Sequence, residues 1–278
     1  MTERLEVKKT YKLFIDGAFV RSESGRSYEA RAPDGSLLAN AVRASRKDLR
    51  DAVRAARAAA PKWAALTAYN RGQILYRIAE VMETRRAELI DEVRRAEGPE
   101  ADDQVNEAID AWVWYAGLTD KLSQVMGNMN DVAGPYFNLT VPEPTGVAGI
   151  VALDRPSLLG LVLRLAPALC GGNATVVLAS EPHPLVAVAL AECLATSDVP
   201  PGVVNILTGH KSELVPWLAS HLDVDALDVT GVDEADLEDI ERSAADNVKR
   251  VVRGDGARSP YEVTAFMEMK TVWHPKGR

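Results

Sequence analysis

The pattern of apolar and polar positions changes character twice along the chain. Residues 11–20 alternate around an Asp-Gly turn, which predicts a short hairpin leading to a loop at Pro33-Asp34-Gly35.

After this loop the apolar positions take helical spacing. Ser45 is the predicted N-cap of a helix ending near Leu66, and a second helix is predicted from about residue 68 to residue 96. A third helix is predicted to end at Gly127. The apolar stripes consist of Leu75, Ile78, Met82, Leu89 and Val93 in the second helix and of Val105, Ile109, Trp112 and Ala116 in the third. The pairs Arg85-Arg86 and Arg94-Arg95 fall largely off these stripes, on a face predicted to be solvated.

From Tyr136 onward the chain favours β-structure. Two segments, 136–141 and 147–153, are interpreted as an extended arm or hairpin at about 135–153. Short β-branched runs separated by helix-compatible stretches follow at 174–178, 203–207, 226–229 and 248–252. Strands that are apolar on both faces call for a parallel sheet covered by helices, so the predicted fold is α/β and Rossmann-like, with helices on both faces. Such a sheet offers a ligand crevice at the carboxyl ends of its strands.

Charge and composition narrow the classes of partner. The net charge of −8 opposes binding to nucleic acid and to anionic membrane surfaces. No apolar run approaches the roughly 20 residues of a membrane-spanning helix, and the charged start, residues 1–5, lacks the apolar core of a signal peptide. We therefore expect a cytoplasmic protein whose two cysteines are reduced thiols within helices.

Several segments, in chain order, resemble the aldehyde dehydrogenase superfamily. They are Glu143 to Ile150, Leu165 to Leu169 with Gly172-Asn173, Pro200 to Ile206, Thr230-Gly231, and the C-terminal stretch Ser259 to Trp273. The resemblance implies an NAD-binding-like domain over residues 1–258, which includes the arm, and an oligomerisation strand over residues 259–278. It also implies that the catalytic domain expected between these parts, which would hold the nucleophilic cysteine, is missing.

Departures from the family pattern fall on positions that the family uses to bind the cofactor and to stabilise the oxyanion. Arg155 stands where the resemblance places an asparagine that donates to the oxyanion, and Leu178 replaces a lysine that reaches the adenosine ribose. Glu181 and Gly231 are retained as weak, vestigial cofactor-binding positions. Glu181 has two open interpretations, an acceptor for a ribose hydroxyl or a carboxylate at a helix N-terminus. The turn after Gly231 carries the carboxylates of Asp233, Glu234 and Asp236, which would repel phosphates. NAD(P) binding is therefore expected to be weak or lost.

No catalytic residue is assigned. The family's general base falls on Gly254, and the neighbouring Asp255 would face the other way. Cys170 and Cys193 are interpreted as buried packing residues without a paired base. The histidines are expected in surface or capping roles, with no metal site; they are His183, His210, His221 and His274.

The retained arm and C-terminal strand predict a binding role. In the superfamily these two pieces form a small sheet that docks on the catalytic domain of a neighbouring subunit, so the expected partner is a full-length aldehyde dehydrogenase. The predicted partner-binding residues are Tyr136, Phe137, Leu139, Val141, Val263, Phe266, Met269, Val272 and Trp273. Three alternatives remain open: an aldehyde dehydrogenase with unconventional catalytic residues, a non-catalytic nucleotide sensor, and a decaying gene product without a role.

Overall fold

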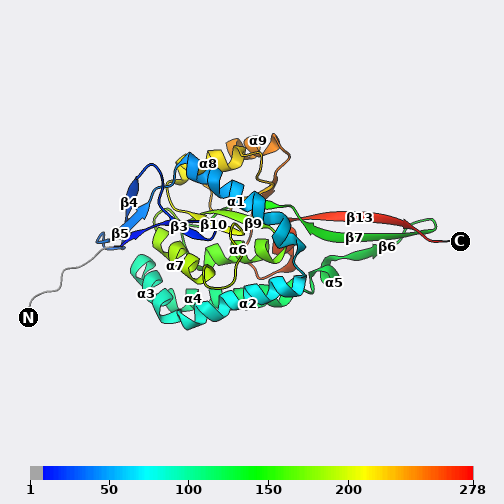
Figure 1. The fold of residues 1–278 in the computed structure, drawn as a ribbon, viewed down its shortest axis with the longest axis horizontal. Helices are drawn as coiled ribbons and strands as arrows, with labels where there is room; N and C mark the ends of the chain where they lie inside the picture. The colour runs from blue at the N-terminus through cyan, green and yellow to red at the C-terminus, as the bar shows by residue number, and fades with distance from the viewer. Residues whose placement is uncertain (1–8, 278) are drawn as a thin grey trace, which may run out of the picture.

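A seven-stranded sheet runs through the body of the molecule in the order β12-β11-β8-β9-β10-β2-β3 (Figure 1). The computed structural model describes residues 9–277, so the charged start at residues 1–5 lies outside the described residues. The strands from β12 to β10 pair in parallel, and the hairpin of β2 and β3 adds to β10 in antiparallel fashion. These strands are β2 (Leu13–Ile15), β3 (Ala18–Val20), β8 (Val147–Val151), β9 (Ala174–Leu178), β10 (Val204–Leu207), β11 (Ala226–Asp228) and β12 (Arg250–Val252).

Helices cover both faces of this sheet, as predicted for an α/β fold. One apolar core joins the sheet to a helical layer that includes the pair Trp63 and Trp112, and a second core lies on the side of α1, α8 and α9. The longer helices are α1 (Arg46–Ala65), α2 (Ala68–Thr84), α3 (Arg86–Glu97), α4 (Ala101–Thr119), α6 (Leu159–Cys170), α7 (Pro184–Leu194), α8 (Lys211–Ser220) and α9 (Leu237–Ala245). The shorter ones are α5 (Leu122–Met126), α10 (Pro260–Thr264) and the 3-10 turn η1 (Glu234–Asp236). No helix within residues 9–277 is long and apolar enough to cross a membrane.

The predicted N-terminal hairpin is confirmed. Asp16 and Gly17 join β2 to β3 with φ of 52° and 75°, the left-handed conformation that an Asp-Gly hairpin turn uses. The sequence did not predict the small sheet of β1 (Thr10–Tyr11), β5 (Leu37–Val42) and β4 (Ser27–Arg31), in which the Pro33–Gly35 segment is the turn between two strands.

The first predicted helix is confirmed as α1, whereas the second and third are each divided. α1 begins as expected, because the Ser45 side chain accepts the N–H of Asp48 and the Asp48 carboxylate accepts the N–H of Ser45. The helix predicted over 68–96 breaks at Arg85, whose side chain turns aside to pair with Glu88 and with Glu192 of α7. This arginine is therefore half-buried rather than solvated, whereas Arg94 and Arg95 are exposed as predicted. The third predicted helix likewise divides into α4 and α5.

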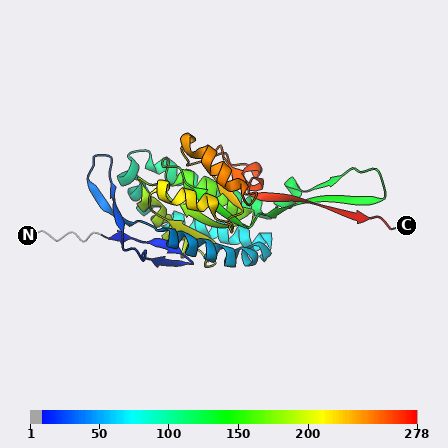
Figure 2. The ribbon, with the colours of Figure 1, turned by 90° about the horizontal axis from the view of Figure 1, so that it is seen from above.

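A three-stranded sheet projects from one end of the body, opposite the end where β4 and β5 lie (Figures 1 and 2). We call it the arm; its strands, in the order β13-β7-β6, are β13 (Met267–Pro275), β7 (Tyr136–Pro144) and β6 (Asn128–Asn130). β7 and β13 pair in antiparallel register from Met267↔Pro144 to Pro275↔Tyr136. The expected extent of the arm, about 135–153, is wrong at its end, because β8 is a central strand of the large sheet.

Candidate functional site

The carboxyl ends of the parallel strands surround a cavity of about 480 Å³. The strand order reverses between β8 and β11, which is where an open α/β sheet forms a ligand crevice. The crevice is lined by residues that follow four different strands: Asp154 after β8, Glu181 after β9, Lys211 after β10, and Gly231 and Asp233 after β11. The retained positions Glu181 and Gly231 are therefore brought together, as members of one cavity.

Lys211 lines this crevice and bonds to the protein around it. Its ammonium donates to the carbonyl of Ala152 at 2.7 Å, to Asp154 Oδ1 at 2.7 Å and to the carbonyl of Gly231 at 3.1 Å. All three donors of the ammonium are thus used, and they tie the end of β8 to the end of β11. The side chain is only 16% exposed, which keeps it fixed in this position.

Glu181 is a capping residue for α8. Its Oε2 accepts the backbone N–H of Lys211 at 2.8 Å, and its Oε1 lies 2.6 Å from Nδ1 of His210, the N-cap residue. Of the two interpretations left open, the carboxylate at a helix N-terminus is the one found, although the helix is α8 and not α7, which directly follows Glu181. The carboxylate therefore already occupies the place where this helix start would attract an anion.

The acidic turn after Gly231 adds negative charge to the same cavity. Asp233, Asp236 and Asp239 all line it, and Lys211 is the one basic side chain among its lining residues. Gly231 itself is packed so tightly that a Cβ there would lie 2.0 Å from the Ala152 carbonyl oxygen. The crevice is thus narrow at its floor and acidic along its wall.

Arg155 lies at a second opening, beside the start of α6. Its Nε donates to Nε2 of His183 at 3.0 Å. Glu97 covers the start of α6 itself, because its carboxylate accepts both the N–H of Ser157 at 2.8 Å and the Ser157 hydroxyl. His183 is the N-cap residue of α7, in line with the expected surface or capping role, although its side chain makes no capping hydrogen bond. It is 7% exposed, and burial lowers its pKa.

The remaining candidate residues hold structural positions. Cys170 and Cys193 are fully buried, as predicted, and burial raises the pKa of each thiol to about 11. Asp255 is exposed and accepts the N–H of Ala257, so it caps a turn. Leu178 is a buried strand residue. His210 and His221 flank α8 as its caps, and His274 is exposed on β13. Within residues 9–277 no group of three metal-ligating side chains is gathered.

A buried ionic cluster was missed by the sequence analysis. Arg164 of α6 donates through Nε to Asp228 of β11 at 2.5 Å and through Nη1 to Glu262 of α10. Burial acts to lower the pKa of Arg164, but the two carboxylates outweigh it and raise the pKa. The available signal was a charged residue inside an otherwise apolar helix and another inside an apolar strand. Lys211 gave no signal of this kind, because a lysine at a helix start is usual on a surface.

A comparison with protein families decides the affiliation. The model described as "Aldehyde dehydrogenase family" matches residues 19–274. The chain belongs to the aldehyde dehydrogenase family. Among curated proteins it is 33% identical to the putative aldehyde dehydrogenase DhaS of Bacillus subtilis, over 94% of this chain and 54% of that protein. It is also 33% identical to human retinal dehydrogenase 2, over 96% of this chain and 52% of that protein.

Solved structures match the fold as well. The NAD+ complex of the Bacillus cereus enzyme superposes with a TM-score of 0.81 at 28% identity, covering 87% of this chain and 50% of that one. HpcC from Thermus thermophilus superposes with a TM-score of 0.82 at 31% identity, covering 88% and 48%. This member of the aldehyde dehydrogenase family thus spans about half the length of such relatives.

Proposed function

We propose that this chain is a non-catalytic subunit that assembles with a full-length aldehyde dehydrogenase and supports or regulates it. The observation that carries the proposal is the exposed apolar surface of the arm. The arm projects beyond a body whose ligand crevice has an acidic wall and a lysine already bonded to the protein, so binding a protein is the function that the geometry favours.

The register of the arm separates its two faces. Residues that alternate along β7 share a face with the residues directly opposite them on β6 and β13. One face, which we call the apolar face of the arm, carries Met129, Phe137, Leu139, Val141 and Val272, which are 71%, 45%, 41%, 40% and 53% exposed. The register puts Glu143, Glu268, Lys270 and His274 on the same face, where Lys270 pairs with Glu143. Exposed apolar side chains gathered on one surface mark an interaction site.

The opposite face of the arm is satisfied by its own contacts. Asn130 Nδ2 donates to Asn138 at 2.6 Å and to the Thr140 hydroxyl at 2.8 Å, and the hydroxyls of Thr140 and Thr271 lie 3.1 Å apart. Tyr136 and Trp273 pack edge to face with ring centroids 5.7 Å apart, also on this side. This face also exposes Tyr136, Met269 and Trp273, at 40%, 43% and 57%. We propose that the partner contacts the apolar face, because the polar groups of the opposite face already bond to one another.

The prediction of partner binding is wrong for two residues. Val263 lies in the short helix α10, not in a strand, and both Val263 and Phe266 are 0% exposed. They anchor the start of β13 to the body. Among the predicted residues the apolar face retains Phe137, Leu139 and Val141 together with Val272, whereas Met269 shares the polar side with Tyr136 and Trp273.

The outer edge of β13 adds a second way to bind. The strand has nine residues and pairs only with β7 within the described part of the chain. Unpaired strand edges take up further strands, and natural proteins cover them. In the family as the resemblance describes it, the arm docks on a partner's catalytic domain, and this chain covers only about half of its relatives, so we propose that a complete enzyme supplies the receiving surface.

Three features of the site support a non-catalytic role. The polar groups of Lys211 and Glu181 in the crevice are already bonded to the protein, the carboxylates along its wall disfavour phosphates, and both thiols are buried in protonated form. NAD(P) binding by the isolated chain is accordingly proposed to be weak or lost.

Co-expression with full-length aldehyde dehydrogenases, followed by size-exclusion chromatography with light scattering, tests the proposal. We expect co-elution at a fixed stoichiometry, and loss of it when Leu139 and Val272 are both changed to aspartate. Val248→Asp is the matched control, because it makes the same chemical change at a 91% exposed valine outside the arm. Co-elution that survives L139D/V272D, or no co-elution with any enzyme, contradicts the proposal. Tight NAD(P) binding in the crevice would instead favour the nucleotide sensor.

A further inference from the structure

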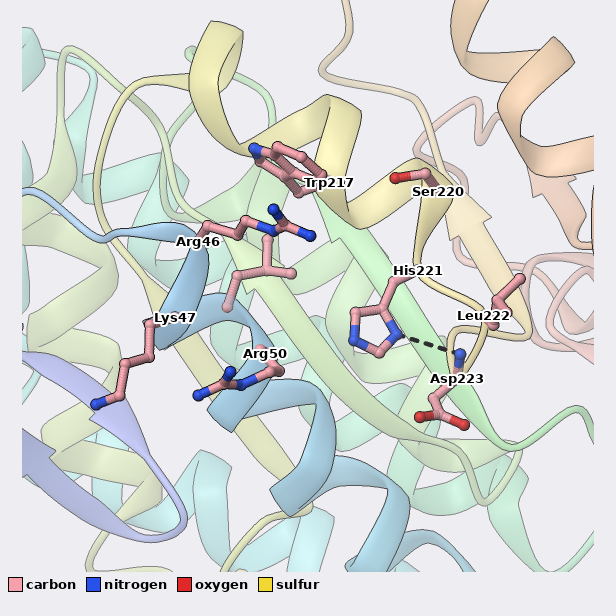
Figure 3. Close-up of a pocket in the computed structure, with 9 residues that line it drawn as sticks. Arg46, Lys47, Arg50, Trp217, Ser220, His221, Leu222 and Asp223 are labelled. Atoms are coloured by element: carbon pink, nitrogen blue, oxygen red, sulfur yellow. Dashed lines mark hydrogen bonds between the residues drawn. The ribbon is translucent and has the colours of Figure 1, made fainter.

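A second open cavity lies on the far side of α8 from the crevice. It has a volume of about 930 Å³ and runs between the first turns of α1 and the end of α8 (Figure 3). Arg46, Lys47 and Arg50 line it from α1, and Trp217, His221 and Leu222 line it from α8 and the turn that follows, where Asp223 is the one carboxylate among its lining residues. We call it the basic groove, since it concentrates positive side chains in a chain whose net charge is −8.

Arg46 is held in place without a carboxylate. Its guanidinium carbon lies 3.6 Å from the ring centroid of Trp217, so one face of the planar group is stacked on the indole. Within residues 9–277 no ion pair involves Arg46. Stacking leaves the N–H groups in the plane of the guanidinium available to a ligand.

Arg50 lies one helical turn further along the same side of α1. Its nearest carboxylate is that of its sequence neighbour Asp51, at 3.5 Å, and its side chain is 56% exposed. Lys47 differs, because Glu23 pairs with it at 2.7 Å. The groove therefore offers two arginines that have donors to spare.

These cations stand where a helix disfavours them. The N-terminus of α1 carries the positive end of the helix dipole, and its own acidic cap, Asp48, is used by Ser45 and by Ser22. Arg46 and Lys47, in the first turn, add like charge to that end. An anion bound between Arg46 and Arg50 relieves this repulsion, which an uncharged ligand does not do.

The opposite wall supplies a neutral donor and apolar contacts. His221 Nδ1 accepts the N–H of Asp223 at 3.2 Å, which leaves the proton of the neutral ring on Nε2. Figure 3 shows this ring projecting into the space between α1 and the end of α8. Trp217 and Leu222 are 42% and 69% exposed and offer apolar surface beside it.

We propose that the basic groove binds a phosphate ester of an aromatic or otherwise apolar organic body. Arg46 and Arg50 hold the phosphate oxygens, His221 donates from the opposite wall, and Trp217 and Leu222 contact the organic part. Donors on two sides of a groove suit a tetrahedral anion with several acceptor oxygens, and the volume leaves room for the attached body. This site is separate from the acidic crevice and does not depend on the proposed assembly.

Isothermal titration of the full chain with adenosine 5′-monophosphate, ribose 5-phosphate, inorganic phosphate and adenosine tests the site. We expect saturable binding of adenosine monophosphate at one site, weakened by about tenfold in R46A and in R50A, the loss expected for one charge-assisted contact. Trp217→Leu should weaken the binding of adenosine monophosphate while leaving the binding of inorganic phosphate unchanged. Arg54→Ala is the matched control, since Arg54 is an exposed arginine on the same helix but outside the groove.

Three results would overturn the inference. The first is that no phosphate probe binds at millimolar concentration. The second is that R54A loses as much affinity for adenosine monophosphate as R46A does, which would indicate a general charge effect. The third is that adenosine binds as tightly as its monophosphate. All four altered side chains are exposed at the surface, and circular dichroism of each variant verifies that it is folded.

Discussion

At the scale of single residues, Lys211 is the side chain that joins the strand ends around the crevice. Its ammonium joins Ala152, Asp154 and Gly231, and so links two strands where a sheet of this type admits ligands. Glu181 complements it by capping α8. The site therefore stabilises the fold through its own polar groups.

Replacing Lys211 by methionine should lower the free energy of unfolding by about 1–3 kcal/mol, because two partly buried carbonyls lose their donor. Urea denaturation measures the change. Lys12→Met is the control, since Lys12 is exposed and forms no ion pair within residues 9–277. An equal effect of both substitutions would show that Lys211 has no special role in the crevice.

The two thiols give a prediction on pH. Burial raises the pKa of Cys170 and Cys193 to about 11, above the ordinary thiol value of 9.0, so the folded state holds these protons more tightly than the unfolded state. Their contribution to stability is full below about pH 9 and falls as pH rises through 11. At pH 8 a disulfide reagent should label neither thiol in the native chain and both in guanidinium. Rapid native labelling would contradict the buried assignment.

Residue roles were predictable where local chemistry fixes them. Ser45 was predicted as an N-cap because capping depends on neighbours within three residues, and both cysteines were predicted as buried because they lie in apolar helices. The roles of Lys211 and Glu97 were not predictable, because each is set by groups far away in sequence that only the fold brings close.

At the scale of elements, the buried cluster of Arg164, Asp228 and Glu262 connects the body to the arm. It ties α6 and the end of β11 to α10, the short helix that leads directly into β13. A Cβ at Gly254 would lie 1.7 Å from the Arg164 guanidinium, so the chain passes close to this cluster. The position of the arm strand thus depends on a charge network within the core.

Glu262→Gln should reduce the free energy of unfolding by about 3 kcal/mol, because it removes one charge of a buried ion pair. Glu268→Gln is the matched control, since Glu268 pairs with Arg250 at an exposed position and such pairs contribute about 1 kcal/mol or less. Chemical denaturation compares the two variants. A loss in E262Q no larger than that in E268Q would refute a structural role for the cluster.

Element type was predictable from periodicity, but element boundaries were not. The apolar stripe continues through Arg85, so spacing alone gave one helix where tertiary pairing with Glu192 produces two. The resemblance to the family placed Val263 in the C-terminal strand, whereas the Ser259 N-cap and Pro260 start a helical turn there.

At the scale of the whole molecule, the body and the arm have opposite character. In the body the polar groups around the crevice bond to one another, whereas the strands of the arm expose eight large apolar side chains and a nine-residue strand edge. The small sheet of β7 and β13 was predictable from the family resemblance. Which of its faces is open was not, because the register and the additional strand β6 determine it.

Native mass spectrometry of the purified chain mixed with full-length aldehyde dehydrogenases of its own host tests the central claim most directly. We predict a hetero-complex of fixed stoichiometry that forms with the V248D control and is absent with L139D/V272D. If the chain remains alone with every full-length enzyme, or if L139D/V272D forms the same complex, the claim that this protein acts as a docking subunit is contradicted.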